Sequence, residues 1–264
     1  IYVLRDDATI HLQLCPLTLT RSIADCRIGI STIKEKWETR LFMPNIGIAT
    51  VDYLQCLYGS YDQSEEAVYI SSHFLPNEQL VEEILSLNPN ESLVFGDQVI
   101  ATFGSDKKKI ETKANLICIK RPWDLFSQNA VVLEDDFAWV TRGRTSQNLD
   151  LHSKLIGDAD QLFIEEGAIV NASIFNTTTG PIYIGKDAEV MENTAIRGAF
   201  ALCEHAGTKL STKVYGATTI GPYCKIGGEV NNSILFGYSN KGHDGFLGNA
   251  VIGEWCNLGA DTNN

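Results

Sequence analysis

The stretch "PIYIGKDAEVMENTAIRGAFALCEHAG", Pro181–Gly207, decides the architecture of the second half of the chain. In it, Ile184, Val190, Ile196 and Leu202 follow one another at a strict interval of six residues. An α-helix repeats its apolar face every three to four residues, and a lone strand repeats every second residue. An interval of six instead indicates the coils of a parallel β-helix, in which each aliphatic side chain points inward.

The same interval returns further along, at Ile220 and Ile226 and again at Ile252 and Leu258. Glycines follow aliphatic residues throughout this region: Gly185, Gly221, Gly227, Gly248, Gly253 and Gly259. A small residue at that place relieves crowding at a corner of the coil. The turns of a β-sandwich would recur at about 8–12 residues, which does not fit the shorter interval. We therefore expect residues 151–264 to form an all-β parallel β-helix.

The first half alternates between two other patterns. Short apolar runs such as "IYVL" (1–4) and "ESLVFGDQVIATF" (91–103) predict strands. Between them, "LPNEQLVEEILSL" (75–87) and "RIGISTIKEKWETRLF" (27–42) carry apolar residues at helical spacing. This alternation predicts a Rossmann-like α/β domain over residues 1–150, built on a largely parallel sheet. Ligands bind such sheets at the carboxyl ends of the strands.

Composition excludes several classes of protein. The chain of 264 residues is 44% hydrophobic and 20% charged, as in soluble globular proteins. A net charge of −12 argues against nucleic acid and anionic membrane surfaces as partners. The seven cysteines form no C-x-x-C pair, and no apolar run is long enough for a signal peptide or a membrane span. We expect a cytoplasmic protein. Because the sequence starts at Ile1 and stops inside the periodic pattern at Asn264, we also expect a longer β-helix.

The last coils carry a more specific signal, "NKGHDGFLGNAVIGEWCNLGADT" (240–262). This stretch resembles the left-handed β-helix of bacterial sugar-phosphate acyltransferases. It is most similar to the acetyltransferase half of the bifunctional N-acetylglucosamine-1-phosphate uridyltransferase/glucosamine-1-phosphate acetyltransferase family. The shared steps are Gly242-His243, Phe246-Leu247-Gly248 and Ile252-Gly253 through Asn257-Leu258-Gly259-Ala260 to Thr262. The close match covers roughly the last forty residues.

The resemblance implies a left-handed β-helix that binds acetyl-CoA and assembles as a homotrimer. It makes His243 the general base that takes a proton from the sugar amine. It makes Asn257 a substrate contact, although an asparagine that stacks between coils is an equal alternative. Lys225, Tyr238 and Lys241 are candidate contacts to phosphate and sugar.

The first half resembles sugar nucleotidyltransferases in "PLTLTRSIADCRIGISTI" (16–33) and "LVFGDQVIA" (93–101). The resemblance implies that Arg21 and Arg27 contact phosphate. It also implies that Asp97 of the Gly-Asp step holds Mg²⁺ with UTP, unless this aspartate only caps a turn. The chain departs from the family pattern twice. The segment "RDDATIHLQLC" (5–15) lacks the glycines of the phosphate loop, and Ser22-Ile23 replaces the lysine expected after Arg21.

Together these features predict a sugar-phosphate transferase of UDP-N-acetylglucosamine-type nucleotide-sugar synthesis. It would acetylate an amino-sugar 1-phosphate from acetyl-CoA, and its first domain would transfer a uridylyl group. One alternative is a nucleotidyltransferase for another sugar 1-phosphate, with a purely structural β-helix. Another is a non-catalytic regulatory subunit that binds a sugar nucleotide.

Overall fold

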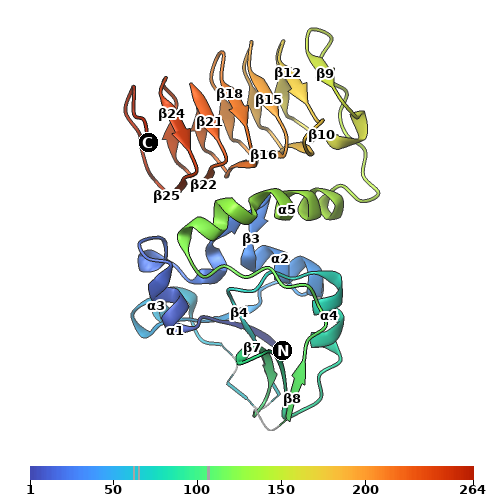
Figure 1. The fold of residues 1–264 in the computed structure, drawn as a ribbon, viewed down its shortest axis with the longest axis vertical. Coiled ribbons are helices and arrows are strands. Elements are labelled where there is room, and N and C mark those ends of the chain that lie inside the picture. The colour runs from blue at the N-terminus through green and yellow to red at the C-terminus, as the bar shows by residue number, and fades with distance from the viewer. Residues whose placement is uncertain (62, 65, 106–107) are drawn as a thin grey trace. The chain divides into compact units, whose positions relative to one another are not determined.

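The computed structural model describes residues 1–61, 63–64, 66–105 and 108–264. The chain forms two compact units. The first unit contains Ile1–Cys26 and Thr32–Pro122, and the second contains Arg27–Ser31 and Trp123–Asn264. Figure 1 shows their elements coloured along the chain. Among the described residues, no helix is long and apolar enough to cross a membrane.

The first unit is built on a six-stranded sheet with the order β4-β1-β5-β7-β6-β8. Its strands are β1 (Tyr2–Arg5), β4 (Gly47–Ala49), β5 (Val68–Ser71), β6 (Glu91–Phe95), β7 (Gln98–Phe103) and β8 (Lys108–Glu111). β1 pairs in parallel with β4 and β5, and β6 pairs in parallel with β8. β7 is antiparallel to both of its neighbours. The apolar run 91–103 is thus a hairpin, since Gly96 takes a left-handed φ of 57° between β6 and β7.

The helices of the first unit are α1 (Ala8–Gln13), α2 (Ile33–Leu41), α3 (Asp52–Tyr58) and α4 (Glu78–Leu85), with the 3₁₀ turns η1 (Leu17–Thr20) and η2 (Ile23–Asp25). A capping box of Thr32 and Glu35 starts α2, which buries Trp37 completely. The predicted apolar face of α4 is confirmed at Leu80, Val81 and Ile84.

The second unit consists mainly of a parallel β-helix with three walls (Figure 1). Sheet 1 contains β10 (Leu162–Ile164), β13 (Ile182–Ile184), β16 (Phe200–Leu202), β19 (Thr218–Ile220), β22 (Ile234–Gly237) and β25 (Val251–Glu254). Sheet 2 contains β11 (Ile169–Val170), β14 (Glu189–Val190), β17 (Gly207–Thr208), β20 (Lys225–Ile226) and β23 (Asn240–Lys241). Sheet 3 contains β9 (Lys154–Ile156), β12 (Ile174–Asn176), β15 (Ala195–Arg197), β18 (Lys213–Tyr215), β21 (Glu229–Asn231) and β24 (Phe246–Gly248). The short turn η3 (Ala159–Gln161) precedes β10.

The six-residue interval has the predicted cause. Ile184, Val190 and Ile196 lie on sheets 1, 2 and 3, and Leu202 pairs in register with Ile184 on sheet 1. All four side chains are at most 2% exposed and belong to one apolar core. Each buried aliphatic of this size stabilises the fold by about 1.5–3 kcal/mol. The expected β-helix is confirmed.

The glycine after the aliphatic is also explained by the fold. A Cβ on Gly221 would lie only 1.9 Å from the carbonyl oxygen of Phe236 in the next coil. No side chain fits there without a shift of the backbone, so glycine permits the close approach of successive coils.

Helix α5 (Pro122–Val140) and the segment 27–31, with β2 (Arg27–Ile28) and the start of β3 (Ser31–Thr32), pack on the outer side of sheet 1. Asn129, which is fully buried, accepts from Gly29 N at 2.7 Å and donates to the Ala217 carbonyl at 3.0 Å. Asp136 accepts from Ile30 N at 2.7 Å. The second compact unit therefore consists of residues 27–31 and 123–264, whereas the sequence predicts a boundary at residue 150.

Candidate functional site

A cleft of about 800 Å³ opens at the carboxyl ends of β1 and β5 in the first unit. It is the place where a sheet of this type binds ligands. The residues that line it are Arg5, Asp6, Asp7, Ala8, Thr9, Ile10, Tyr69, Ser71, His73, Asp97, Gln98, Val99, Thr102, Gly104 and Lys120.

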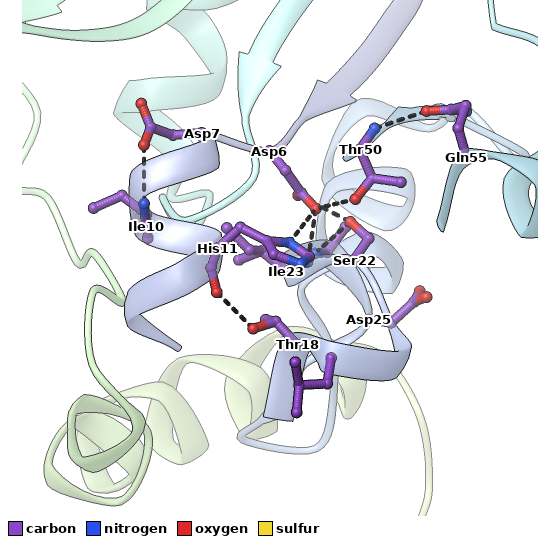
Figure 2. A network of polar contacts seen from close by, with 12 residues as sticks. Asp6, Asp7, Ile10, His11, Thr18, Ser22, Ile23, Asp25, Thr50 and Gln55 are labelled. Carbon is purple, nitrogen blue, oxygen red and sulfur yellow. Dashed lines mark hydrogen bonds and ion pairs between the residues drawn. The ribbon is translucent and has the colours of Figure 1, made fainter. Parts of the chain in front are cut away.

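Asp6, which lines the cleft, is the centre of a network of polar contacts (Figure 2). Its side chain is 0% exposed. It accepts from Ser22 Oγ at 2.9 Å, from Ile23 N at 3.1 Å and from Thr50 Oγ1 at 2.6 Å. His11 Nδ1 lies 3.3 Å from the same carboxylate. The carboxylate thus joins the end of β1 to α1, η2 and the residue after β4, and these bonds use its acceptor capacity for structure.

The turn after β1 contains no glycine, and Asp7 in this turn is the N-cap of α1. Its Oδ1 accepts from Thr9 N and Ile10 N, each at 2.9 Å. In a glycine-rich loop such backbone N–H groups bind phosphate oxygens. Here a side chain of the protein takes two of them, so this turn does not form a phosphate cradle.

Two basic side chains, those of Arg5 and Lys120, supply positive charge in the lining of the cleft. Arg5, at the end of β1, places its guanidinium 3.6 Å from the ring centroid of Tyr69. This cation–π contact orients the guanidinium, and its planar N–H groups match phosphate oxygens. Lys120 lines the same cleft.

His73 follows β5 and is 5% exposed. Its Nδ1 is buried and has no hydrogen-bond partner among the residues that the structure describes. Burial is the main reason why its pKa is lowered to about 4. Its imidazole is therefore uncharged near neutral pH.

Asp97 lies in the turn between β6 and β7, is exposed, and lines the cleft, at the family's Gly-Asp step. No cluster of three metal-ligating side chains exists among the described residues. Magnesium commonly takes one or two carboxylates and completes its shell with water and substrate phosphates. The cleft lining supplies an exposed carboxylate of this kind, that of Asp97.

The two predicted arginine contacts lie elsewhere. Arg21 follows η1, is half-buried, and is absent from the residues that line the cleft. Burial raises the pKa of Asp25, and the charge of Arg21 partly opposes this shift. Arg27 belongs to the second unit and is 8% exposed. It donates to the carbonyls of Phe236 at 3.0 Å and Ile30 at 2.6 Å, so the structure gives it a packing role.

In the β-helix, His243 lies exposed between β23 and β24. Lys241 is 1% exposed, and its Nζ donates to the His243 carbonyl at 2.6 Å. Burial lowers the pKa of this lysine and leaves it no access to a phosphate on the surface. Lys225 is half-buried and donates to the His205 carbonyl at 3.2 Å.

Tyr238 and Asn257 both stack along the coils. The rings of His205, Tyr223, Tyr238 and Trp255 lie face to face, with centroids 4.5–5.1 Å apart from one to the next. Both faces of Tyr238 are therefore covered. Asn240 Nδ2 donates to Asn257 Oδ1 at 2.9 Å, so Asn257 bonds to an asparagine of the preceding coil.

Arg5 and His73 were not predicted from the sequence. Each stands at or directly after the carboxyl end of a parallel strand, in "YVLR" and "YISSH". Polar residues at such ends were the signal that could have found them.

Comparison with known families agrees with this geometry. A family model described as sugar nucleotidyl transferase matches residues 2–145, which is more than half of the chain. No curated protein matches the chain. The matched region contains β1, β5, Asp97 and the whole of the cleft lining. The chain belongs to the sugar nucleotidyl transferase family.

Proposed function

We propose that the first unit transfers a nucleotidyl group from a nucleoside triphosphate to a sugar 1-phosphate. The observation that carries this proposal is the strand-end cleft, which Asp97 lines at the Gly-Asp step. A phosphate oxygen of the sugar phosphate would attack the α-phosphorus, and pyrophosphate would leave. Arg5 and Lys120 are the cations placed to hold the phosphates. A magnesium ion at Asp97 would supply further neutralisation of phosphate charge.

The finer proposal is that UTP is the donor and that the product is a UDP-N-acetylglucosamine-type sugar nucleotide. Support comes from the family and from the resemblance of residues 240–262 to the bifunctional acetyltransferases. Assays with each of four nucleoside triphosphates, offered separately with several sugar 1-phosphates, would identify the donor and the acceptor.

Pyrophosphate release in the presence of Mg²⁺ is the test. We expect Asp97→Ala to lower the rate by about 10²-fold or more, as expected for loss of a charge that stabilises the transition state. Asp52→Ala, an exposed carboxylate of α3 outside the cleft lining, is the matched control and should keep the full rate. Equal rates in the two variants would remove Asp97 from the reaction. Binding of nucleotide without any turnover would favour the regulatory subunit.

Acetyl transfer is a second proposed activity, favoured by the exposed position of His243 at the corner between β23 of sheet 2 and β24 of sheet 3. Neutral imidazole would accept the proton of a sugar amine as it attacks acetyl-CoA. Consumption of acetyl-CoA with glucosamine 1-phosphate should fall by about 10²–10⁴-fold in His243→Ala, the usual size of general base catalysis. His152→Ala, an exposed histidine of the same unit, is the control.

We further propose a cytoplasmic homotrimer. Because α5 and residues 27–31 cover part of sheet 1, contacts between subunits would use sheets 2 and 3. Light scattering would measure the molar mass of the assembly.

A further inference from the structure

The buried histidine of the cleft has no assigned task in nucleotidyl transfer as proposed above. His73 lines the cleft, but its Nδ1 lacks a partner in the described part of the chain. An unpaired buried polar atom destabilises the folded protein. Proteins therefore pair such atoms with protein groups, water or ligand, and an exception at a ligand cleft points to the ligand.

The ring is held in place by its surroundings. The His73 carbonyl accepts from Ile119 N at 2.8 Å. The neighbouring Phe74 packs against the imidazole with ring centroids 4.4 Å apart. The contact with Phe74 and the burial of the side chain, which is 5% exposed, hold the imidazole in the lining of the cleft.

Charges near the ring decide what it can bind. Burial lowers the pKa of His73 most, the carboxylates of Asp7 and Asp6 raise it, and Lys120 lowers it further. The outcome, about 4, leaves one donor and one acceptor nitrogen at neutral pH. A phosphate prefers a cation, which Arg5 and Lys120 provide. An uncharged imidazole suits an uncharged polar group.

We infer that His73 binds an uncharged polar group of the substrate, either the edge of the nucleobase or a hydroxyl of a sugar. The inference rests on the proposed function, because it assigns the neutral part of a nucleotide or sugar phosphate to the His73 end of the cleft. Both sources offer the same hydrogen-bonding chemistry, and the experiment separates them.

The test is calorimetric titration of the full chain and two variants. His73→Leu removes both nitrogens at similar volume, and His73→Asn keeps an amide near the place of Nδ1. The probes are the nucleoside triphosphates, their nucleosides, glucosamine 1-phosphate and inorganic tripolyphosphate. We expect His73→Leu to weaken a nucleotide or the sugar phosphate about tenfold, the effect of one buried hydrogen bond, and to leave tripolyphosphate unchanged. His73→Asn should recover part of the loss. A weaker affinity of His73→Leu for the nucleosides would identify a nucleoside group as the one bound, and a weaker affinity for glucosamine 1-phosphate would identify a hydroxyl of the sugar.

A pH series adds a result that a merely structural role would not produce. The ratio of wild-type to His73→Leu affinity should stay constant from pH 8 to pH 6, because the ring does not titrate there. A ratio that rises as the pH falls through about 6.5 would show an imidazolium bound to phosphate and would overturn the inference.

Failure of the inference and failure of the proposed function give different results. Equal affinities of wild type and both variants for every probe would refute the inference, while pyrophosphate release would keep nucleotidyl transfer. Equal loss of tripolyphosphate binding in His73→Leu would also refute it. If no pair of substrates releases pyrophosphate but His73→Leu still weakens a nucleotide or sugar phosphate selectively, the transfer is refuted and the inference stands.

Discussion

The hydrogen bond from Thr50 to Asp6 allows a quantitative test of the network around Asp6. Thr50 Oγ1 donates to the buried Asp6 carboxylate at 2.6 Å, and Thr50→Val removes this bond while it keeps the shape of the side chain. Hydrogen bonds to charged groups contribute about 1.5–3 kcal/mol. Ser22 Oγ and Ile23 N still satisfy part of the carboxylate, so we expect the lower half of that range.

The assay is urea denaturation of the full chain, followed by circular dichroism. A loss of about 1.5–2 kcal/mol should lower the midpoint of the first unit's transition by about 1 M, for a slope of about 2 kcal/mol/M. Thr20→Val, an exposed threonine of η1, is the control and should change stability by less than about 0.5 kcal/mol. If Thr50→Val falls within the same limit as the control, Asp6 does not stabilise the first unit in the way that we describe.

Three further predictions concern other parts of the fold. Burial keeps the pKa of His73 at about 4, below the value of about 6.5 for an unfolded chain, so the unfolded state binds the extra proton between these values. The free energy of unfolding should thus carry no His73 contribution to its pH dependence above pH 6.5 and fall by roughly 3 kcal/mol as the pH drops to 4; His73→Asn, measured by urea titration at each pH, should lack this decrease. Asn129→Ala should lower stability by about 2–5 kcal/mol because it leaves the Gly29 N–H and the Ala217 carbonyl without their partner; Gln128→Ala, exposed on the same helix, should not. Gly221→Ala should lose about 1–3 kcal/mol in thermal unfolding through its 1.9 Å approach to Phe236 O, whereas Gly253→Ala, with open space around it, should match the wild type.

The sequence predicted the β-helix because one physical requirement repeats along it. Every coil needs an inward-pointing aliphatic side chain on each wall. The same requirement is therefore visible at four successive positions: Ile184, Val190, Ile196 and Leu202. An error at one position would not have hidden the pattern. The order of elements in the first unit was predictable for the same reason, although the antiparallel β7 was not, because a single turn residue reverses the chain at Gly96.

The site residues were harder to predict, since residue type does not reveal burial. Asp97 lies in the cleft at its motif position, but Arg27 and Lys241, chosen for their charge, are buried and bonded to backbone carbonyls. Arg5 and His73 have no motif in the sequence. Only the fold shows that both residues line one cleft at the ends of neighbouring strands. Only the fold shows that His73 Nδ1 has no hydrogen-bond partner among the described residues.

Segment 27–31 limits how the second half of the chain can be replaced in a fusion protein. It belongs to the second unit although the first unit continues on either side of it, so the chain passes between the units at 26/27, 31/32 and 122/123. A foreign solenoid fused after Pro122 would lack Asn129, Asp136 and Thr219, the side chains that bond to Gly29 and Ile30. A replacement of residues 123–264 must therefore keep the side chains that bond to residues 27–31, which precede most of the first unit in the sequence.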